Sequence, residues 1–112
     1  MNALEKADEF LRLHGEYENK IVILNTFFAK ALVNSVEDYN RDAVSDITRG
    51  LYDEIAKYTD ELSKETDISK KVDIALRRDN YLNEMLTRYG IVYNNDDKKD
   101  VKNRWFYLVL VL

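Results

Sequence analysis

The only histidine of the chain, His14, stands four residues before Glu18. In a helix this spacing places both side chains on one face, where an imidazole nitrogen and a carboxylate could contact one metal ion. Two ligands do not complete a metal site, and no second histidine is present to build the Glu-x-x-His pairs of di-iron bundles. We therefore interpret His14 as a half-buried structural residue and predict neither a metal site nor a cofactor.

Carboxylates are plentiful, and four of them cluster between residues 37 and 46: Glu37, Asp38, Asp42 and Asp46. Acid–base catalysis by a carboxyl pair needs two groups whose pKa values are driven apart inside a cleft. Acids also gather at helix starts because they favour the positive end of the helix dipole. The second interpretation is preferred, so no catalytic residue is assigned here.

Other catalytic chemistries lack their residues. The chain has no cysteine, which excludes disulfides, thiolate nucleophiles and cysteine metal sites. It also has no phosphate-binding loop of the GxxxxGK[ST] type. The sequence therefore predicts a protein without enzymatic activity.

Asp79 interrupts an apolar seam that repeats nearly every seven residues. The seam consists of Ile68, Val72, Ala75, Leu82, Leu86 and Tyr89. An acid within such a seam needs a partner, and we expect Arg49 from another helix or a tyrosine hydroxyl. Either Asp79 sets the helix register or selects a partner protein, or the seam is exposed at this point. The sequence leaves both interpretations open.

The net charge of −4 conceals opposite charges in two parts of the chain. Residues 1–69 hold eight Lys and Arg against fifteen Asp and Glu, a net charge of −7, whereas residues 70–112 hold nine against six, a net charge of +3. We prefer the interpretation that the two parts attract each other over a basic surface for an acidic partner. A pI near 5.0 also argues against a nucleic-acid-binding surface.

The segment of residues 21–33 contains only three polar residues, Asn25, Thr26 and Lys30. It leaves almost no polar face, so we expect it to be the central core helix, covered from several sides. It is well short of the ~20 apolar residues that span a bilayer.

The spacing of apolar residues before residue 21 predicts that this helix begins at about residue 2. Gly15 is the position within it where helical structure is least favoured. Glycine costs about 1 kcal/mol of helix propensity relative to alanine, so a kink or a break is expected there. A continuous helix would leave residues 2–15 overhanging the shorter helices that follow, and their apolar stripe would fold back over the bundle or pack against a second chain. The stripe consists of Leu4, Ala7, Phe10, Leu11 and Leu13. It is the candidate dimer interface.

A second amphipathic helix is expected after the polar residues 37–42, with Asn40 as its N-cap. Its apolar residues recur at steps of three and four: Val44, Ile47, Leu51, Ile55, Tyr58 and Leu62. Gly50 in its middle either permits close approach of another helix, which is slightly preferred, or simply lowers stability.

The third helix has the clearest ends. Thr66 or Asp67 is placed to cap its start. Gly90 is expected at its end, in the left-handed C′ position of a Schellman motif that brings Ile91 against Leu86.

The segment of residues 101–112 fits two secondary structures. Its Trp, Phe, Tyr and Val residues favour a strand, whereas four apolar residues recur at helical steps: Val101, Trp105, Leu108 and Leu112. Helix is chosen because a lone strand would leave its backbone groups unpaired. Three aromatic residues could dock on a membrane or in a partner's groove: Trp105, Phe106 and Tyr107. A last core helix is the preferred interpretation of the segment.

Together these features predict one all-α domain over residues 1–112, an antiparallel four-helix bundle that becomes five helices if the first breaks near Gly15. The first residues lack an apolar signal core, which indicates a cytoplasmic protein. We expect a non-enzymatic protein-interaction module that forms a homodimer and acts as an adaptor, regulatory or accessory protein, as small bundles in phages and plasmids do. Its interaction residues would be Leu4, Phe10, Leu11, Asp79, Trp105, Phe106 and Tyr107. A nucleic-acid-binding regulator is the second hypothesis, and a membrane-surface immunity-type protein is the third.

Overall fold

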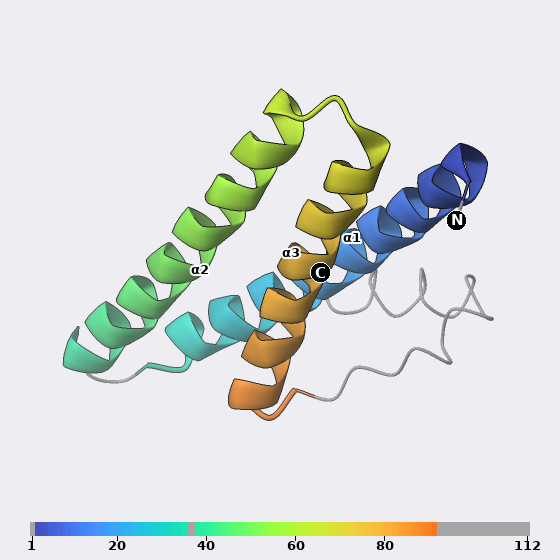
Figure 1. The fold of residues 1–112 in the computed structure, drawn as a ribbon. Helices are drawn as coiled ribbons and strands as arrows, with labels where there is room; N and C mark the ends of the chain where they lie inside the picture. Colours follow the sequence, from blue (N-terminus) through green and yellow to red (C-terminus); the bar gives the residue numbers. More distant parts are fainter. Residues whose placement is uncertain (1, 36–37, 92–112) are drawn as a thin grey trace.

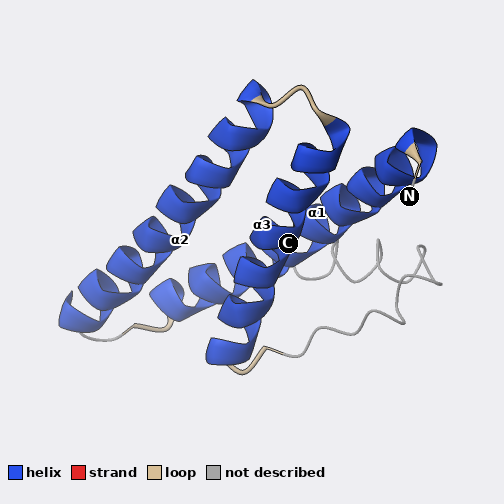
Figure 2. Cartoon of the chain, viewed as in Figure 1, coloured by secondary structure: helices blue, strands red, loops and turns tan. Residues whose placement is uncertain are grey.

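The computed structural model of the chain describes residues 2–35 and 38–91. Within these residues it contains three helices and no strand: α1 (Ala3–Val33), α2 (Asp38–Lys64) and α3 (Ile68–Arg88) (Figures 1 and 2). The all-α prediction is thus confirmed for the described part of the chain. The expected fourth helix, residues 101–112, lies outside the described residues.

The three helices alternate in direction along the chain, so that α1 and α3 run the same way and α2 runs opposite to both (Figure 1). Lys6 donates a hydrogen bond to Ser69 at the starts of α1 and α3, and the rings of Phe28 and Tyr89 meet at the ends of the same two helices. The most extensive helix–helix contact joins α1 and α3. Because α2 packs against both, the core forms where the three helices meet.

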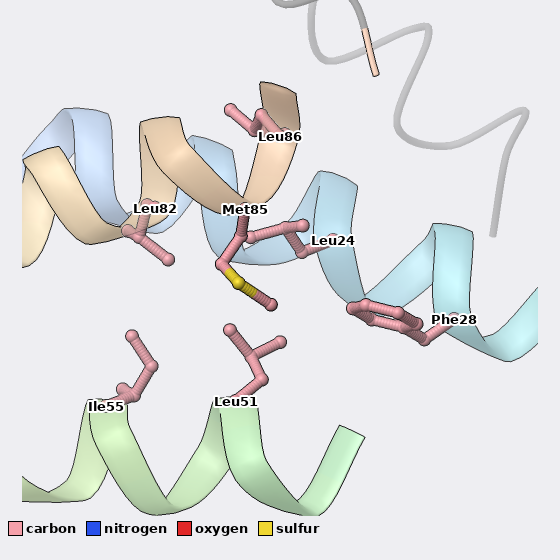
Figure 3. Packing of buried hydrophobic residues seen from close by; sticks show 7 residues of the cluster. All are labelled: Leu24, Phe28, Leu51, Ile55, Leu82, Met85 and Leu86. Carbon is pink, nitrogen blue, oxygen red and sulfur yellow. The ribbon is translucent and has the colours of Figure 1, made fainter. Parts of the chain in front are cut away.

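The core consists of seven buried side chains drawn from all three helices: Leu24, Phe28, Leu51, Ile55, Leu82, Met85 and Leu86. Figure 3 shows Leu51 and Ile55 on α2 pointing toward Leu82, Met85 and Leu24 on the other two helices. The apolar faces predicted for the second and third helices are therefore the ones that pack in the core, except that Ile47 of the second helix is 37% exposed.

Both ends of α3 are as predicted. The Asp67 carboxylate accepts a hydrogen bond from the Lys70 N–H at 3.1 Å, which caps the start of the helix. At the other end Gly90 has a φ of 66°, and the Ile91 N–H donates to the Leu86 carbonyl at 2.9 Å. These features form the Schellman motif, and Ile91 packs against the core.

The expected break at Gly15 is wrong, because α1 continues without interruption from Ala3 to Val33. The five-helix alternative is therefore wrong as well. Leu13, Glu16 and Lys20 are buried on either side of Gly15. Tertiary packing of this face outweighs the propensity cost of one glycine.

The predicted overhang of residues 2–15 is also wrong, since the hydrogen bond from Lys6 to Ser69 shows that α3 starts beside the second turn of α1. The apolar stripe of this segment divides between two sides of the helix. Leu13 is buried, whereas Leu4 is 73% exposed and Leu11 is 66% exposed.

Two smaller predictions need correction. Asn40 is not an N-cap, because α2 already begins at Asp38 and Asn40 lies inside its first turn. Residues 21–33 supply Leu24 and Phe28 to the core, but Val33 is exposed and Phe27 is 36% exposed, so this segment is covered less completely than expected. Among the described residues, two neighbouring helices cover one broad face of α1 and do not cover its other side.

Candidate functional site

Four charged side chains are gathered between α1 and α3, and Lys20 is at their centre. Its Nζ donates a hydrogen bond to Asp79 Oδ1 at 2.6 Å and lies 3.7 Å from Glu16 Oε2. The side chains of Lys20 and Glu16 are 3% and 2% exposed, and that of Asp79 is 13% exposed. A buried charge is tolerated only when it is paired and hydrogen-bonded, and Lys20 provides this for Asp79.

The need for a partner to Asp79 is thereby confirmed, but the expected partner is wrong. Arg49 lies on α2, where it approaches Asp46 at 3.7 Å in an exposed ion pair. Asp79 faces α1, so neither Arg49 nor a tyrosine hydroxyl is the residue that binds it.

Arg78 is the fourth charged residue and is 3% exposed. The central carbon of its guanidinium lies 3.8 Å from the centroid of the Tyr17 ring, a cation–π contact. Burial lowers the pKa of Arg78, while Tyr17 and Asp79 raise it in part. Its Nε and Nη2 atoms are buried and make no hydrogen bond within the described residues, whereas the guanidinium contacts the face of the Tyr17 ring.

The sequence carries one signal for this cluster, in the period of α1. The buried residues of α1 recur at steps of three, four, four and four: Leu13, Glu16, Lys20, Leu24 and Phe28. Charged residues such as Glu16 and Lys20 are usually assigned to the solvent-facing side of a helix. A second series of residues, which passes through His14 and Tyr17, has the same helical spacing, so the spacing alone does not show which series is buried. The cluster joins α1 to α3 through the ion pair between Lys20 and Asp79.

His14 lies outside this cluster on the exposed side of α1. Its Nε2 is 2.9 Å from Glu18 Oε1, and its side chain is 47% exposed, so it is half-buried as predicted. Within residues 2–35 and 38–91, no three His, Asp or Glu residues are grouped so as to hold a metal ion. Among the predicted acid cluster, Asp42 and Asp46 are exposed, and Glu37 lies outside the described residues.

The predicted interaction residues fall into separate places. Leu4 and Leu11 share the outer face of α1, whereas Phe10 is half-buried on another side and Asp79 is in the charged cluster. Trp105, Phe106 and Tyr107 lie outside the described residues. The structure thus brings together only the two leucines as an exposed apolar surface on α1.

Arg12 lies beside this surface, directly after Leu11. It pairs with Glu9 through two hydrogen bonds, and this hydrogen bonding raises the pKa of Arg12, an effect that desolvation partly opposes. Half of the Arg12 side chain is exposed. Arg12 therefore remains a fixed positive charge at the edge of the leucine surface.

The Tyr81 phenol lies between α2 and α3, with its ring 6.1 Å from that of Tyr58. Burial raises the pKa of Tyr81 above 10.0, and the nearby Glu54 carboxylate acts in the same direction. The contribution of Tyr81 to stability is thus present below pH ~10 and is lost as the pH rises through its raised pKa. Phenolate absorbance of the wild type minus that of Tyr81→Phe should reveal a group that titrates above the tyrosines of the unfolded chain; titration at or below them would contradict this.

No protein-family model, curated protein or solved structure matches this chain. None of the helices within residues 2–35 and 38–91 combines the length and the apolar character needed to cross a bilayer. The function of the chain is therefore inferred from the geometry of the described residues.

Proposed function

We propose that this protein is a cytoplasmic, non-enzymatic protein-interaction module that self-associates through the outer face of α1. The observation that carries the proposal is the exposure of Leu4 and Leu11, which are 73% and 66% exposed on one helix face. Moving a leucine side chain from water into an apolar contact is worth roughly 1.5–3 kcal/mol. A symmetric dimer would bury Leu4 and Leu11 of both copies.

The basic residues of α3 support the proposal over the nucleic-acid alternative. Arg77 pairs with Glu61 at 2.9 Å and Arg88 approaches Glu84 at 4.0 Å. Arg78 is buried beneath Tyr17. All three charges have contacts within the chain, and Arg77 pairs with a carboxylate of the acidic part, residues 1–69, which favours attraction between the acidic and basic parts over a basic surface for phosphates.

We also propose that residues 101–112 form a fourth helix of the bundle, with Trp105, Phe106 and Tyr107 near its middle. Their docking on a membrane, as in an immunity-type protein, is the competing proposal. Sedimentation with anionic vesicles that is lost in Trp105→Ala would favour the membrane proposal.

The self-association proposal is tested with the double variant Leu4→Asp/Leu11→Asp. It should be monomeric under conditions in which the wild type is a dimer, because the substitutions would add four buried carboxylates to each interface. The variant should keep the helical circular-dichroism spectrum of the wild type, since both positions are exposed in the single chain. Light scattering coupled to size-exclusion chromatography measures the mass.

The matched control is Leu76→Asp, which places a carboxylate at an exposed leucine of α3. This variant should remain a dimer. A double variant as dimeric as the wild type, or a control that dissociates equally, would show that the outer face of α1 is not the interface.

A further inference from the structure

Four residues form one continuous line along the outer side of α1. They stand at steps of four, three and four: Leu4, Asp8, Leu11 and Gly15. This is the spacing of the a and d positions at which two helices pack against each other. The described parts of α2 and α3 pack on the other side, where Leu13, Lys20 and Leu24 are buried. The line is therefore a seam available to another helix.

Gly15 is the unusual member of this seam. A Cβ atom placed on Gly15 would meet nothing within 4 Å, and its φ is not in the left-handed region. Neither backbone conformation nor packing within the described chain requires glycine here, although it costs about 1 kcal/mol of helix propensity. A glycine in a helix seam does allow a large side chain of a second helix to approach the backbone closely.

Building on the proposed self-association, we infer that the partner is a second copy of this chain, with the two α1 helices antiparallel and Leu4 of each copy seated over Gly15 of the other. In antiparallel packing the a position of one helix meets the d position of its neighbour, so Leu4 faces Gly15 and Asp8 faces Leu11. The two-fold axis repeats both contacts. A large side chain thus meets an open backbone position at each end of the seam.

Parallel packing of the same seam is disfavoured. It would place the two Asp8 carboxylates against each other, which is destabilising. It would also place Gly15 opposite Gly15 and leave that layer without side chains. The antiparallel arrangement avoids both.

The charges beside the seam fit the antiparallel arrangement. Glu5 and Arg12 are seven residues apart and follow Leu4 and Leu11 directly, so they flank the seam on the same edge. Antiparallel packing brings residues of this edge together, which sets Glu5 of one copy near Arg12 of the other, twice by symmetry. Both side chains lie on the exposed surface, and Arg12 keeps its positive charge.

The first test is Gly15→Ala in the full chain, with Gly50→Ala as the matched control. Gly50 is also a helical glycine with nothing within 4 Å of an added Cβ, but it lies on α2. Both variants should unfold at a higher temperature when measured as monomers, because alanine favours helix. Only Gly15→Ala should also raise the dissociation constant of the dimer, by about tenfold, since the added methyl group occupies the place of Leu4.

The second test exchanges the charges. Glu5→Arg and Arg12→Glu should each weaken the dimer several-fold, by placing like charges together, and the double variant Glu5→Arg/Arg12→Glu should restore the wild-type dissociation constant. Sedimentation equilibrium gives all three constants. In the parallel arrangement the two positions do not meet, and the double variant would be no tighter than the single ones.

The outcomes separate this inference from the proposed function. A wild type that stays monomeric overturns both. A dimer that is lost in Leu4→Asp/Leu11→Asp, but is unaffected by Gly15→Ala and shows no charge-swap rescue, keeps the self-association and overturns the antiparallel arrangement. Selective weakening by Gly15→Ala together with rescue supports it.

Discussion

Replacing Phe28 with alanine should lower the free energy of unfolding by about 3–5 kcal/mol, the usual cost of deleting a buried phenylalanine side chain. Phe28 is 3% exposed and packs edge-on against Tyr89, with ring centroids 5.1 Å apart. The substitution would open a cavity between α1 and the end of α3. Urea denaturation at a fixed protein concentration measures the loss, because association adds to apparent stability.

Phe27→Ala is the matched control, since it removes the same side chain from the neighbouring position. Phe27 is 36% exposed, although its ring also lies 5.9 Å from that of Tyr89. Its loss should be clearly smaller than that of Phe28→Ala. A loss below about 1 kcal/mol for Phe28→Ala would mean that the core has been placed wrongly.

Lys20→Ala should be comparably destabilising, by about 3–5 kcal/mol, because it leaves the Asp79 carboxylate in a buried site without its hydrogen-bonded cation. Thermal or urea unfolding of the variant measures the loss. An exposed pair provides the contrast: Arg77→Ala removes the partner of Glu61 and should cost less than about 1 kcal/mol.

The double variant Lys20→Met/Asp79→Leu distinguishes loss of the pair from loss of one partner. Replacing both charges by apolar side chains of similar size removes the Asp79 carboxylate but leaves buried Glu16 without Lys20, so part of the stability lost in Lys20→Ala should return. If Lys20→Ala cost no more than Arg77→Ala, the buried pair would not link α1 to α3 in solution.

Features set by neighbouring residues could be predicted from the sequence. Asp67 and Gly90 mark the ends of α3 because capping depends on the backbone groups of one helix turn. The apolar period of α2 identifies Leu51 and Ile55 in the same way. In each case the signal lies within a few residues of the element that it describes.

Features set by contact between distant residues could not be predicted from the sequence. The partner of Asp79 is Lys20, which is 59 residues away, and nothing in the sequence distinguishes it from other cations. Gly15 does not break α1, since the buried faces on either side of it hold the helix together. Leu4 and Leu11 are recognisable as apolar from the sequence, but only the structure separates them from Leu13 as an exposed pair.

The mass of the wild-type protein in solution tests the proposed self-association most directly. Light scattering across a series of protein concentrations should show the mass rise toward twice the 13.2 kDa of one chain, because the outer face of α1 is proposed to bind its own copy. A mass that stays at 13.2 kDa throughout the series would contradict the proposed self-association.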